Sequence, residues 1–376
     1  MSAKAVGTGG AGGRPKAVVA MSGGVDSSVA AALLVEQGYD VTGIMLKLWR
    51  EEADNTGSGC CNLGAAEDAR RVADVLGIPF YVLNFAERFE RTVIDDFHES
   101  YAAGRTPNPC VRCNQWIKFD ALLERARALG ADVLATGHYA RVEHAAGRLR
   151  LLRGVDASKD QSYVLWMLTQ DQLAHARFPV GGMPKTETRA IAAELGLRTA
   201  AKPDSQEICF VRKGELGDYI ARNMPQAARA GDIVDRSGDI VGRHRGIGNF
   251  TVGQRKGLGI SLGVPLYVTS IDAEANEIVV GEPRDLEVRS MTTDGTSFVA
   301  AALDEGAEVL VQHRAHGAVH AAHVVRRAGD GLELVFERPV AALAPGQSAA
   351  FYSMSDPREL LGGGFIAETV RAEAVA

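Results

Sequence analysis

The first half of the chain alternates short apolar runs with longer amphipathic segments. The apolar runs predict buried strands at residues 18–21, 41–48, 78–85 and 132–136. Apolar residues at helical spacing between these runs predict helices at residues 27–37, 65–76, 87–103 and 117–129. A glycine, the residue that most often ends a helix, follows each predicted helix. This alternation predicts an α/β domain with a doubly wound parallel sheet and helices on both faces.

The pattern changes further along the chain. A hairpin is predicted at residues 141–154, and helices are predicted at 162–176 and 186–195. After residue 214 short strands with glycine turns dominate, and from residue 288 the pattern is that of strands alone. We therefore predict a flexible tail at 1–15, an α/β domain at 16–214, a small β-rich central domain at 215–287 and a C-terminal β-barrel or sandwich at 288–376.

Composition narrows the class of protein. An apolar fraction of 46% and a charged fraction of 23% are typical of a folded protein. The glycine-rich residues 1–15 lack the apolar core of a signal peptide, and no segment approaches the roughly 18 apolar residues that cross a membrane. We therefore expect a cytoplasmic protein that does not contact a membrane. Its five cysteines should then stay reduced and do not form a disulfide framework.

The distribution of charged residues is more informative about the binding partner than the net charge is. A net charge of −6 argues mildly against a nucleic-acid partner. However, residues 105–153 contain nine Lys or Arg and four Asp or Glu, and residues 240–271 contain four basic residues and no carboxylate. The four are Arg243, Arg245, Arg255 and Lys256. These stretches are either one polyanion-binding face or ordinary solvated surface.

The segment at residues 18–28, VVAMSGGVDSS, carries the first candidate chemistry. A strand, a glycine turn and a helix direct unpaired backbone N–H groups and the positive end of a helix at an anion. Gly23 and Gly24 allow the backbone to approach that anion closely. Further donors are the hydroxyls of Ser22, Ser27 and Ser28. SGGVDS is neither the Walker A nor the dinucleotide motif, and resembles the pyrophosphate loop of ATP pyrophosphatases. The alternative is an ordinary turn between strand and helix.

A second candidate segment follows the predicted strand at 132–136. Ligands of open α/β sheets bind at the carboxyl ends of the strands. Gly137 and His138 fall at such an end, as the SGGVDS turn does, so one nucleotide site is expected there. His138 is otherwise interpreted as a strand-end histidine with a structural role.

The cysteines are the second group of candidate functional residues. Residues 106–114 read TPNPCVRCN, and Pro107 and Pro109 predict an irregular loop there. Cys110 and Cys113 lie close to arginines, which lower the pKa of a thiol and favour the reactive thiolate. The arginines are Arg105 and Arg112. Cys209 follows about a hundred residues later in DSQEICF, and Cys60 and Cys61 are adjacent loop residues.

Three hypotheses account for these thiols. Structural zinc requires four ligands, and the chain has no second CxxC. Cys110, Cys113 and Cys209 are also sufficient to hold an iron–sulfur cluster with one open iron. In the third hypothesis Cys209 carries a persulfide, and Cys113 attacks it and leaves a disulfide. The third fits an adenylating enzyme best, because an activated carbonyl carbon requires a nucleophile.

Several segments together resemble one family, the bacterial tRNA-specific 2-thiouridylases of the MnmA type. The similarity runs from Lys16 to Glu368. The segments that carry it are SGGVDSS (22–28), GRTPNPCVRCN (104–114), IKF (117–119), ATGHYAR (135–141), KDQSYVL (159–165), KPDSQEICF (202–210), TVGQRKGLGI (251–260) and APGQSAAFY (344–352). Many relatives have Asp where this chain has Cys110, and the extra thiol strengthens the cluster hypothesis.

The resemblance implies a catalytic pyrophosphatase-type domain, a small central domain and a C-terminal β-barrel. It implies that the protein converts the wobble uridine to 2-thiouridine in tRNAs for Lys, Glu and Gln. The implied reaction uses ATP to adenylate uridine O2, and Mg²⁺ would bind the ATP phosphates. ATP would contact Ala20, Met21, Ser22, Gly23, Gly24, Val25, Asp26 and Ser27, with Leu46 and Gly137 on the adenine side.

The resemblance also implies the remaining roles. Cys209 would carry the persulfide, Cys113 would be the second catalytic cysteine, and the target base would be held by Asn108, Pro109 and Cys110. Expected tRNA contacts are His138, Lys159, Asp160, Gln161, Gln312, His313 and Gln347. The expected partners are tRNA and a sulfur donor, either a cysteine desulfurase or a sulfur-relay protein, and the chain is expected to be a monomer. Alternatives are an amide ligase with the same loop and a non-catalytic tRNA-binding or sulfur-relay protein.

Overall fold

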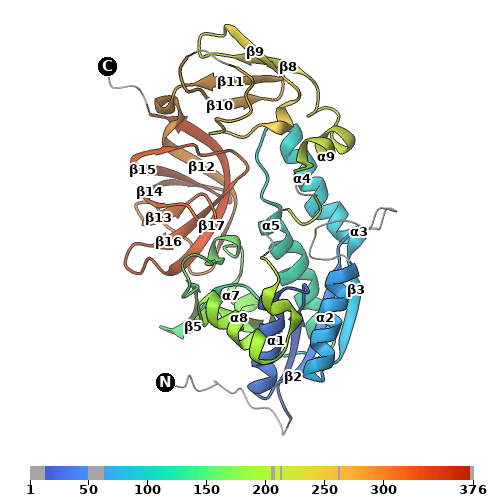
Figure 1. Ribbon diagram of the computed structural model, residues 1–376. Helices are drawn as coiled ribbons and strands as arrows, with labels where there is room; N and C mark the ends of the chain where they lie inside the picture. The colour runs from blue at the N-terminus through green and yellow to red at the C-terminus, as the bar shows by residue number, and fades with distance from the viewer. Residues whose placement is uncertain (1–12, 50–62, 205–207, 212–213, 261–262, 373–376) are drawn as a thin grey trace.

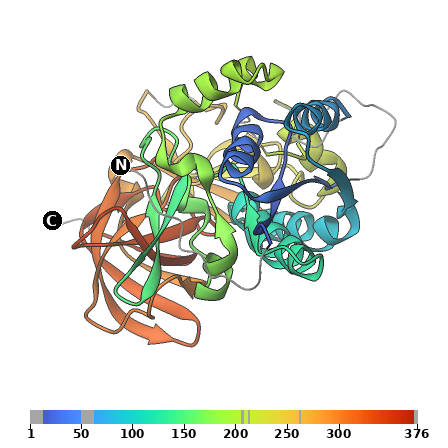
Figure 2. The same cartoon turned by 90° about the horizontal axis from the view of Figure 1, so that it is seen from below.

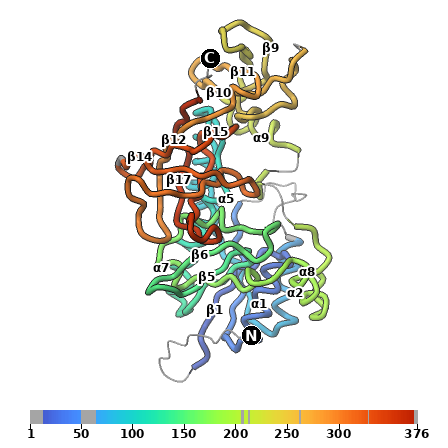
Figure 3. The backbone as a smooth tube through the Cα atoms, turned by 90° about the vertical axis from the view of Figure 1, so that its left-hand side faces the viewer, coloured from blue at the N-terminus to red at the C-terminus, as the bar shows by residue number. Residues whose placement is uncertain are grey.

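The computed structural model describes residues 13–49, 63–204, 208–211, 214–260 and 263–372. The chain forms an α/β unit, a small β-rich unit at the far end of the molecule, and a barrel that lies beside both (Figure 1). Seen from another side, the backbone trace shows the α/β unit and the small unit at opposite ends with the barrel between them (Figure 3).

A parallel sheet forms the centre of the α/β unit, as the sequence predicts. Its strand order is β3-β2-β1-β4-β7, and every neighbouring pair is parallel. The strands are β1 (Lys16–Ala20), β2 (Asp40–Lys47), β3 (Phe80–Asn84), β4 (Val133–Ala135) and β7 (Ala176–Arg177). The short β7 was not predicted, because residues 176–177 lie at the end of an expected helix.

Alternation along β1 divides the core of this unit into two layers. Ala17 and Val19 pack in one cluster with residues of α1 (Val25–Glu36), α2 (Leu63–Leu76) and α8 (Lys185–Glu194). Val18 points to the other face, where it packs in a second cluster. Because successive side chains of a strand face opposite sides, one strand serves both layers, and the predicted doubly wound arrangement is confirmed.

Two long helical segments cover the second face. The first consists of α3 (Ala86–Phe89), the π-helical η1 (Glu90–Ile94) and α4 (Asp95–Ala102), which confirms the helix predicted at 87–103. The second consists of α5 (Pro109–Arg112), the π-helical η2 (Cys113–Leu122) and α6 (Leu123–Ala128).

The predicted irregular loop around the CxxC segment is therefore wrong from residue 109 onward. Proline is tolerated in the first turn of a helix, where its missing N–H would have no helical partner. Pro109 stands at this position, and the side chain of Asn108 accepts a hydrogen bond of 3.3 Å from the backbone N–H of Val111. Pro107 thus lies in the extended segment, and Pro109 begins the helix that carries Cys110 and Cys113.

The helix expected at 162–176 is only partly present. The segment forms a 3₁₀ turn, η3 (Ser162–Val164), and a short helix, α7 (Gln170–His175). α7 begins at a capping box between Thr169 and Gln172, which fixes its start eight residues later than predicted. The helix expected at 186–195 is confirmed as α8.

The central unit is a four-stranded sheet with the order β10-β11-β8-β9. Its elements are α9 (Leu216–Asn223), β8 (Gly231–Val234), β9 (Ile240–His244), β10 (Tyr267–Asp272) and β11 (Glu277–Gly281). Phe97 and Tyr101 of α4 belong to the core of this unit, so the long helix reaches out of the α/β unit into it. α9 was not predicted.

The C-terminal unit is a closed barrel, as predicted. Its ring has the order β12-β15-β14-β13-β16-β17, and β12 pairs with β17 to close it. The strands are β12 (Glu287–Phe298), β13 (Glu308–Gln312), β14 (Val319–Ala328), β15 (Gly331–Ala341), β16 (Ser348–Ser353) and β17 (Glu359–Arg371). Short 3₁₀ turns elsewhere are η4 (Pro179–Gly182), η5 (Arg198–Ala201), η6 (Ile247–Asn249) and η7 (Pro283–Leu286).

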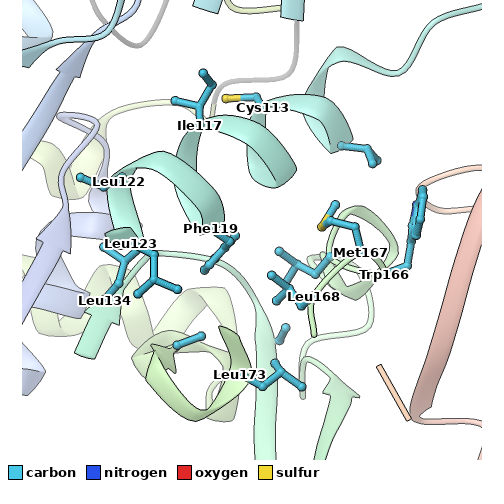
Figure 4. Close-up of a cluster of buried hydrophobic side chains, with 14 of the residues drawn as sticks. Cys113, Ile117, Phe119, Leu122, Leu123, Leu134, Trp166, Met167, Leu168 and Leu173 are labelled. Atoms are coloured by element: carbon cyan, nitrogen blue, oxygen red, sulfur yellow. The ribbon is translucent and has the colours of Figure 1, made fainter. Parts of the chain in front are cut away.

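The α/β unit and the barrel share both a sheet and a core. The predicted hairpin is present as β5 (Ala140–Ala145) and β6 (Arg148–Arg153), and β6 pairs with β17 of the barrel. Figure 2 shows this hairpin against the barrel. The indole of Trp166 packs edge-on against Phe365, at a centroid distance of 5.2 Å, in the cluster that also contains Cys113 (Figure 4).

Candidate active site

The turn between β1 and α1 is built for close backbone approach. Gly23 has φ +69°, and a Cβ on it would collide with the backbone carbonyl of Ala65 in α2. Glycine is the residue that meets both requirements. Gly24 is the N-cap of α1 and has extended backbone angles. The turn therefore places the N-terminal N–H groups of a twelve-residue helix at the carboxyl edge of the sheet.

All three serine hydroxyls make hydrogen bonds within this turn, and those of Ser22 and Ser27 lie 3.3 Å apart. The Ser27 hydroxyl accepts a hydrogen bond of 3.1 Å from the backbone N–H of Ser22, and the Ser28 hydroxyl donates to the carbonyl of Gly24 at 2.8 Å. Ser27 and Ser28 are buried, whereas Ser22 is exposed. Of the three predicted hydroxyl donors, Ser22 is the one that faces solvent.

Gly137 lies directly against the start of α1. A Cβ on Gly137 would lie 2.7 Å from the backbone nitrogen of Ser27 and 2.9 Å from the Cβ of Asp26. The ends of β1 and β4 thus meet at one place, as the sequence predicts for a nucleotide site. Leu46 lies near the end of β2 and is 8% exposed, in the cluster on the far face of the sheet.

Asp26 is the centre of an ion network that the sequence analysis missed. Lys185, at the start of α8, approaches both carboxylate oxygens of Asp26 at 2.7 and 2.8 Å and also pairs with Asp204 at 2.8 Å. The Tyr139 hydroxyl donates to Asp26 at 2.8 Å, and burial raises the pKa of Tyr139, so it remains a donor. No spacing signal connects Lys185 to Asp26, because 159 residues separate them.

The segment that precedes Cys209 is bound to the glycine turn. Lys202 donates to the carbonyl of Gly23 at 2.9 Å and pairs with Asp68 at 2.8 Å. Asp204 accepts from Lys159 as well as from Lys185, each at 2.8 Å. Partial burial of Asp204 raises its pKa, but the hydrogen bonds from the two lysines outweigh this effect and lower the pKa to about 2.

These contacts concentrate positive charge beside the turn. Four cations meet three carboxylates there. The cations are Lys159, Lys185, Arg189 and Lys202, and the carboxylates are Asp26, Asp68 and Asp204. Lysines and an arginine next to the N–H groups at the start of a helix suit a polyanionic ligand such as a nucleotide phosphate.

The structure brings Cys113 and Cys209 to the same hydrophobic cluster. Cys113 is 8% exposed and belongs to that cluster, and the half-buried Cys209 packs against it together with Phe210. Figure 4 shows Cys113 next to Ile117 on the helix that follows α5. Cys110, one turn earlier, is exposed. Cys60 and Cys61 lie outside the described residues.

The arginines beside the CxxC segment have carboxylate partners. Arg112 donates to Asp96 at 2.9 Å and stacks on Phe365 at 3.9 Å, and Arg105 pairs with Asp294 at 3.7 Å. The predicted lowering of the thiol pKa by these arginines stays a prediction.

The positions of the side chains that could bind a metal ion are relevant to the zinc and iron–sulfur hypotheses. Within the described ranges, no three His, Cys, Asp or Glu side chains lie where they could hold a metal ion. Cys110, Cys113 and Cys209 are therefore not arranged as ligands of a cluster, and a zinc site is not assembled from them. Mg²⁺ is commonly held by substrate phosphates with one or two carboxylates. Asp26 is the carboxylate at the turn, and Lys185 holds both of its oxygens.

The residues expected to contact tRNA fall into two groups. Gln161 is exposed, and Lys159 and Gln347 are half-buried. The other group is buried: His138 is 8% exposed, Asp160 5%, Gln312 2% and His313 6%. In this conformation the buried side chains do not face solvent.

Asp160 and Gln312 are joined through Arg153. The Arg153 guanidinium donates to Asp160 and to the side-chain oxygen of Gln312, each at 2.6 Å, and stacks on Tyr352 at 3.6 Å. Gln312 and Tyr352 belong to the barrel, whereas Arg153 and Asp160 belong to the α/β unit and its hairpin. The arginine therefore links the two units.

His138 and His313 both have a pKa below the usual value of histidine. His138 makes a 2.7 Å hydrogen bond with the Thr136 hydroxyl, and burial, reinforced by the charge of Lys118, lowers its pKa well below the usual value. Burial also lowers the pKa of His313, to about 4, with the charge of Arg314 acting in the same direction. Neither imidazole offers a positive charge to a phosphate near neutral pH.

Gln347 lies against the CxxC segment. Its side-chain amide donates to the carbonyls of Thr106 and Pro107, at 3.3 and 3.2 Å. The target-base residues predicted from the sequence begin at the next position, Asn108.

No helix in the described part of the chain is long and apolar enough to cross a membrane.

Comparison with known families defines the class of protein first. Three family models match in succession: "tRNA methyl transferase HUP domain" at residues 15–213, "tRNA methyl transferase PRC-barrel domain" at 217–282 and "Aminomethyltransferase beta-barrel domain" at 288–366. The chain thus has the three-part architecture of a tRNA-modifying class with an α/β domain followed by two β domains.

Curated relatives then define the family. The chain is 47% identical to the tRNA-specific 2-thiouridylase MnmA of Carboxydothermus hydrogenoformans, covering 94% of this chain and 98% of that protein. It is 48% identical to the protein of that name in Heliobacterium modesticaldum, covering 89% of each. For Geobacter metallireducens the identity is 47%, over 94% of this chain and 97% of the relative. The chain belongs to the tRNA-specific 2-thiouridylase (MnmA) family.

Solved structures give more distant similarities. One is a 4-thiouridine synthetase in complex with RNA and ATP, with a TM-score of 0.35 and 20% identity over 52% of this chain and 45% of that chain. Another is the NMN synthetase of Francisella tularensis, with a TM-score of 0.33 and 16% identity over 51% of this chain and 66% of that chain.

Proposed function

We propose that this protein replaces O2 of the wobble uridine of tRNA by sulfur, in an ATP-dependent reaction that uses a cysteine persulfide. The observation that carries the proposal is the ion network that binds the segment before Cys209 to the glycine turn, through Lys185 and Lys202. A phosphate-binding turn and a sulfur-carrying cysteine serve one reaction only if they act at the same site. The 2-thiouridylase relatives support tRNA as the substrate.

The first step is activation of the uridine. We place the ATP phosphates on residues 20–27 and the adenine side near Leu46 and Gly137. Uridine O2 attacks the α-phosphorus, the bond to the β-phosphate oxygen breaks, and pyrophosphate leaves. Mg²⁺ bound to the phosphates would offset their charge. The contribution of the chain is the turn N–H groups and the lysines beside Asp26.

The second step transfers sulfur. The terminal sulfur of a Cys209 persulfide bonds to C2 of the adenylated base. The Cys113 thiolate then attacks the Cys209 sulfur, so the persulfide S–S bond breaks and a Cys113–Cys209 disulfide forms. The Cys113 sulfur is oxidised from a thiol to a disulfide, the transferred sulfur is reduced, and AMP leaves with the former O2. The two thiol protons go to solvent, and an external thiol reductant restores the cysteines.

The shared cluster of Cys113 and Cys209 supports this route, because both cysteines pack on the same hydrophobic group. We assign Asn108, Pro109 and Cys110 to the target base, because they lie at the start of the helix that carries Cys113. We further propose tRNAs for Lys, Glu and Gln as substrates. The proposed sulfur donor is a cysteine desulfurase or a sulfur-relay protein, and the proposed form is a cytoplasmic monomer.

The test is a thiolation assay with unmodified glutamate tRNA, ATP and a persulfide donor, using protein purified without oxygen and freed of iron. We expect the product nucleoside to have the mass of 2-thiouridine. A product nucleoside with the mass of unmodified uridine would contradict the proposal. Activity that requires iron would overturn the persulfide route in favour of a cluster, and AMP release without tRNA would favour an amide ligase.

Single cysteine variants sharpen this test. Cys209→Ala and Cys113→Ala should abolish thiolation, because each removes one sulfur of the proposed exchange, whereas Cys60→Ala is the matched control and should remain active. Full activity of Cys209→Ala would overturn the persulfide mechanism.

A further inference from the structure

A turn of the barrel lies against the segment that leads into the cysteine helix. The backbone N–H of Thr106 donates to the carbonyl of Pro345 at 2.8 Å. In the opposite direction, the Gln347 amide donates to the carbonyls of Thr106 and Pro107. Three hydrogen bonds therefore join residues 345–347 to residues 106–107, which are 240 positions apart in the chain.

Gly346 brings the two backbones into direct contact. It has φ +88°, and a Cβ there would lie 2.8 Å from the carbonyl oxygen of Thr106 and 2.9 Å from both the nitrogen of Thr106 and the Cβ of Arg105. The turn itself is held by β17, since the Gly346 N–H donates to Ile366 and the Ile366 N–H donates to Gln347, both at 2.8 Å. The contact is thus a rigid barrel turn against an extended segment.

The barrel also holds the helix beyond this segment. Arg112 stacks on Phe365 of β17 at 3.9 Å, and the hydroxyl of Tyr163, a residue of the α/β unit, donates to the carbonyl of Ser348 at 2.9 Å. Between these contacts, Asn108 caps the helix. The start of the helix that carries Cys110 and Cys113 is therefore bound to the barrel at more than one point.

We propose that Gly346 and Gln347 are positioning residues, through which the barrel fixes residues 106–108 and hence the start of the cysteine helix. In this role Gln347 acts inside the protein, before any tRNA is bound. The catalytic part of the inference rests on the proposed thiolation, but the positioning itself does not. The competing role for Gln347 is a direct contact with tRNA.

The two roles separate in the free protein. We would measure hydrogen exchange of the full chain, without tRNA or ATP, for wild type, Gln347→Ala and Gly346→Ala. The positioning role predicts exchange about ten-fold faster at the amides of Thr106, Val111 and Arg112, because the variants remove or displace hydrogen bonds that hold them. Wild-type exchange in Gln347→Ala, together with weaker tRNA binding, would overturn the proposal and assign Gln347 to a tRNA contact.

Gly306→Ala is a matched control for Gly346→Ala. Gly306 has φ +83°, close to that of Gly346, and lies in the same barrel, but no atom lies within 4 Å of its added Cβ. It imposes the same backbone strain without the contact, so exchange at residues 106–112 should stay at the wild-type rate. Equal acceleration in both glycine variants would overturn the proposal, because barrel destabilisation alone would then explain the effect. If Gly346→Ala does not fold, Gln347→Ala decides the question.

Kinetic measurements on thiolation and on Cys113 alkylation distinguish positioning from a simple loss of stability. For Gln347→Ala we expect kcat for thiolation to fall about ten-fold, with the KM for tRNA unchanged, and the pH profile of Cys113 alkylation to shift. A rise in KM with an unchanged kcat would contradict positioning. Should wild type fail to thiolate tRNA, the exchange experiment still tests the barrel contact, so the two failures are distinguishable.

Discussion

Two charged networks of this protein differ in the burial of their carboxylates and in their main cations. At the glycine turn, Lys185 joins Asp26 to Asp204, and Lys159 and Arg189 also pair with Asp204, so lysines provide most of the cations. Between the α/β unit and the barrel, Arg153 joins Asp160 to Gln312 and stacks on Tyr352. A lysine ammonium is a compact charge that can exchange one partner for another, whereas the planar arginine fork fits a fixed set of acceptors. The lysine network therefore suits a site that a polyphosphate enters and leaves, and the arginine network suits a permanent joint.

The largest effect should follow from removing the joint. Arg153→Ala leaves Asp160 buried without its cation, and breaking such a pair costs about 3–5 kcal/mol. We expect a loss of unfolding free energy in that range, measured by urea denaturation. At temperatures where the variant is folded, tRNA affinity should change little, because Asp160 and Gln312 face inward. A variant of wild-type stability that fails to bind tRNA would reverse this assignment.

The comparison also explains what the sequence could predict. The glycine turn and Gly137 were predictable, because each follows a strand and parallel strands end at one edge of the sheet. Lys185 was not, since its partner Asp26 lies 159 residues away and the fold alone brings them together. The burial of Asp160 and Gln312 could not be predicted either, because a polar side chain gives no sign of an arginine partner from another unit.

Proline led to an error for a different reason. Pro109 is incompatible with the interior of a helix but suits its first turn, and the sequence alone favoured the wrong alternative. The capping residue, Asn108, was the signal that could have decided it.

A smaller effect on activity should follow from Lys185→Ala at the glycine turn. Hydrogen bonds to charged groups contribute about 1.5–3 kcal/mol, so we expect kcat/KM for ATP to fall about ten- to a hundred-fold. Lys185→Arg should restore part of this loss, because it keeps the charge but not the compact shape. Lys16→Ala, at the exposed opposite edge of the sheet, is the control and should match wild type. If Lys185→Ala were as active as wild type, the ion network would have no role in nucleotide use.

The smallest effect is a change in acid stability. The pKa of Asp204 is about 2 in the folded protein, below the roughly 3.9 of an unfolded aspartate. A depressed folded-state pKa contributes stability above the unfolded value, and that stability is lost as the pH falls from about 4 toward about 2. Asp204→Asn should therefore lower stability at neutral pH and show a shallower decline over this window in urea titrations. The difference should stay below about 1 kcal/mol, because the carboxylate is partly exposed and solvent screens it. If stability declined with the same pH slope in wild type and variant, the lysines would stabilise the Asp204 carboxylate no more than water does. The distinction between the exchangeable lysine network and the fixed arginine joint would then lose its electrostatic basis.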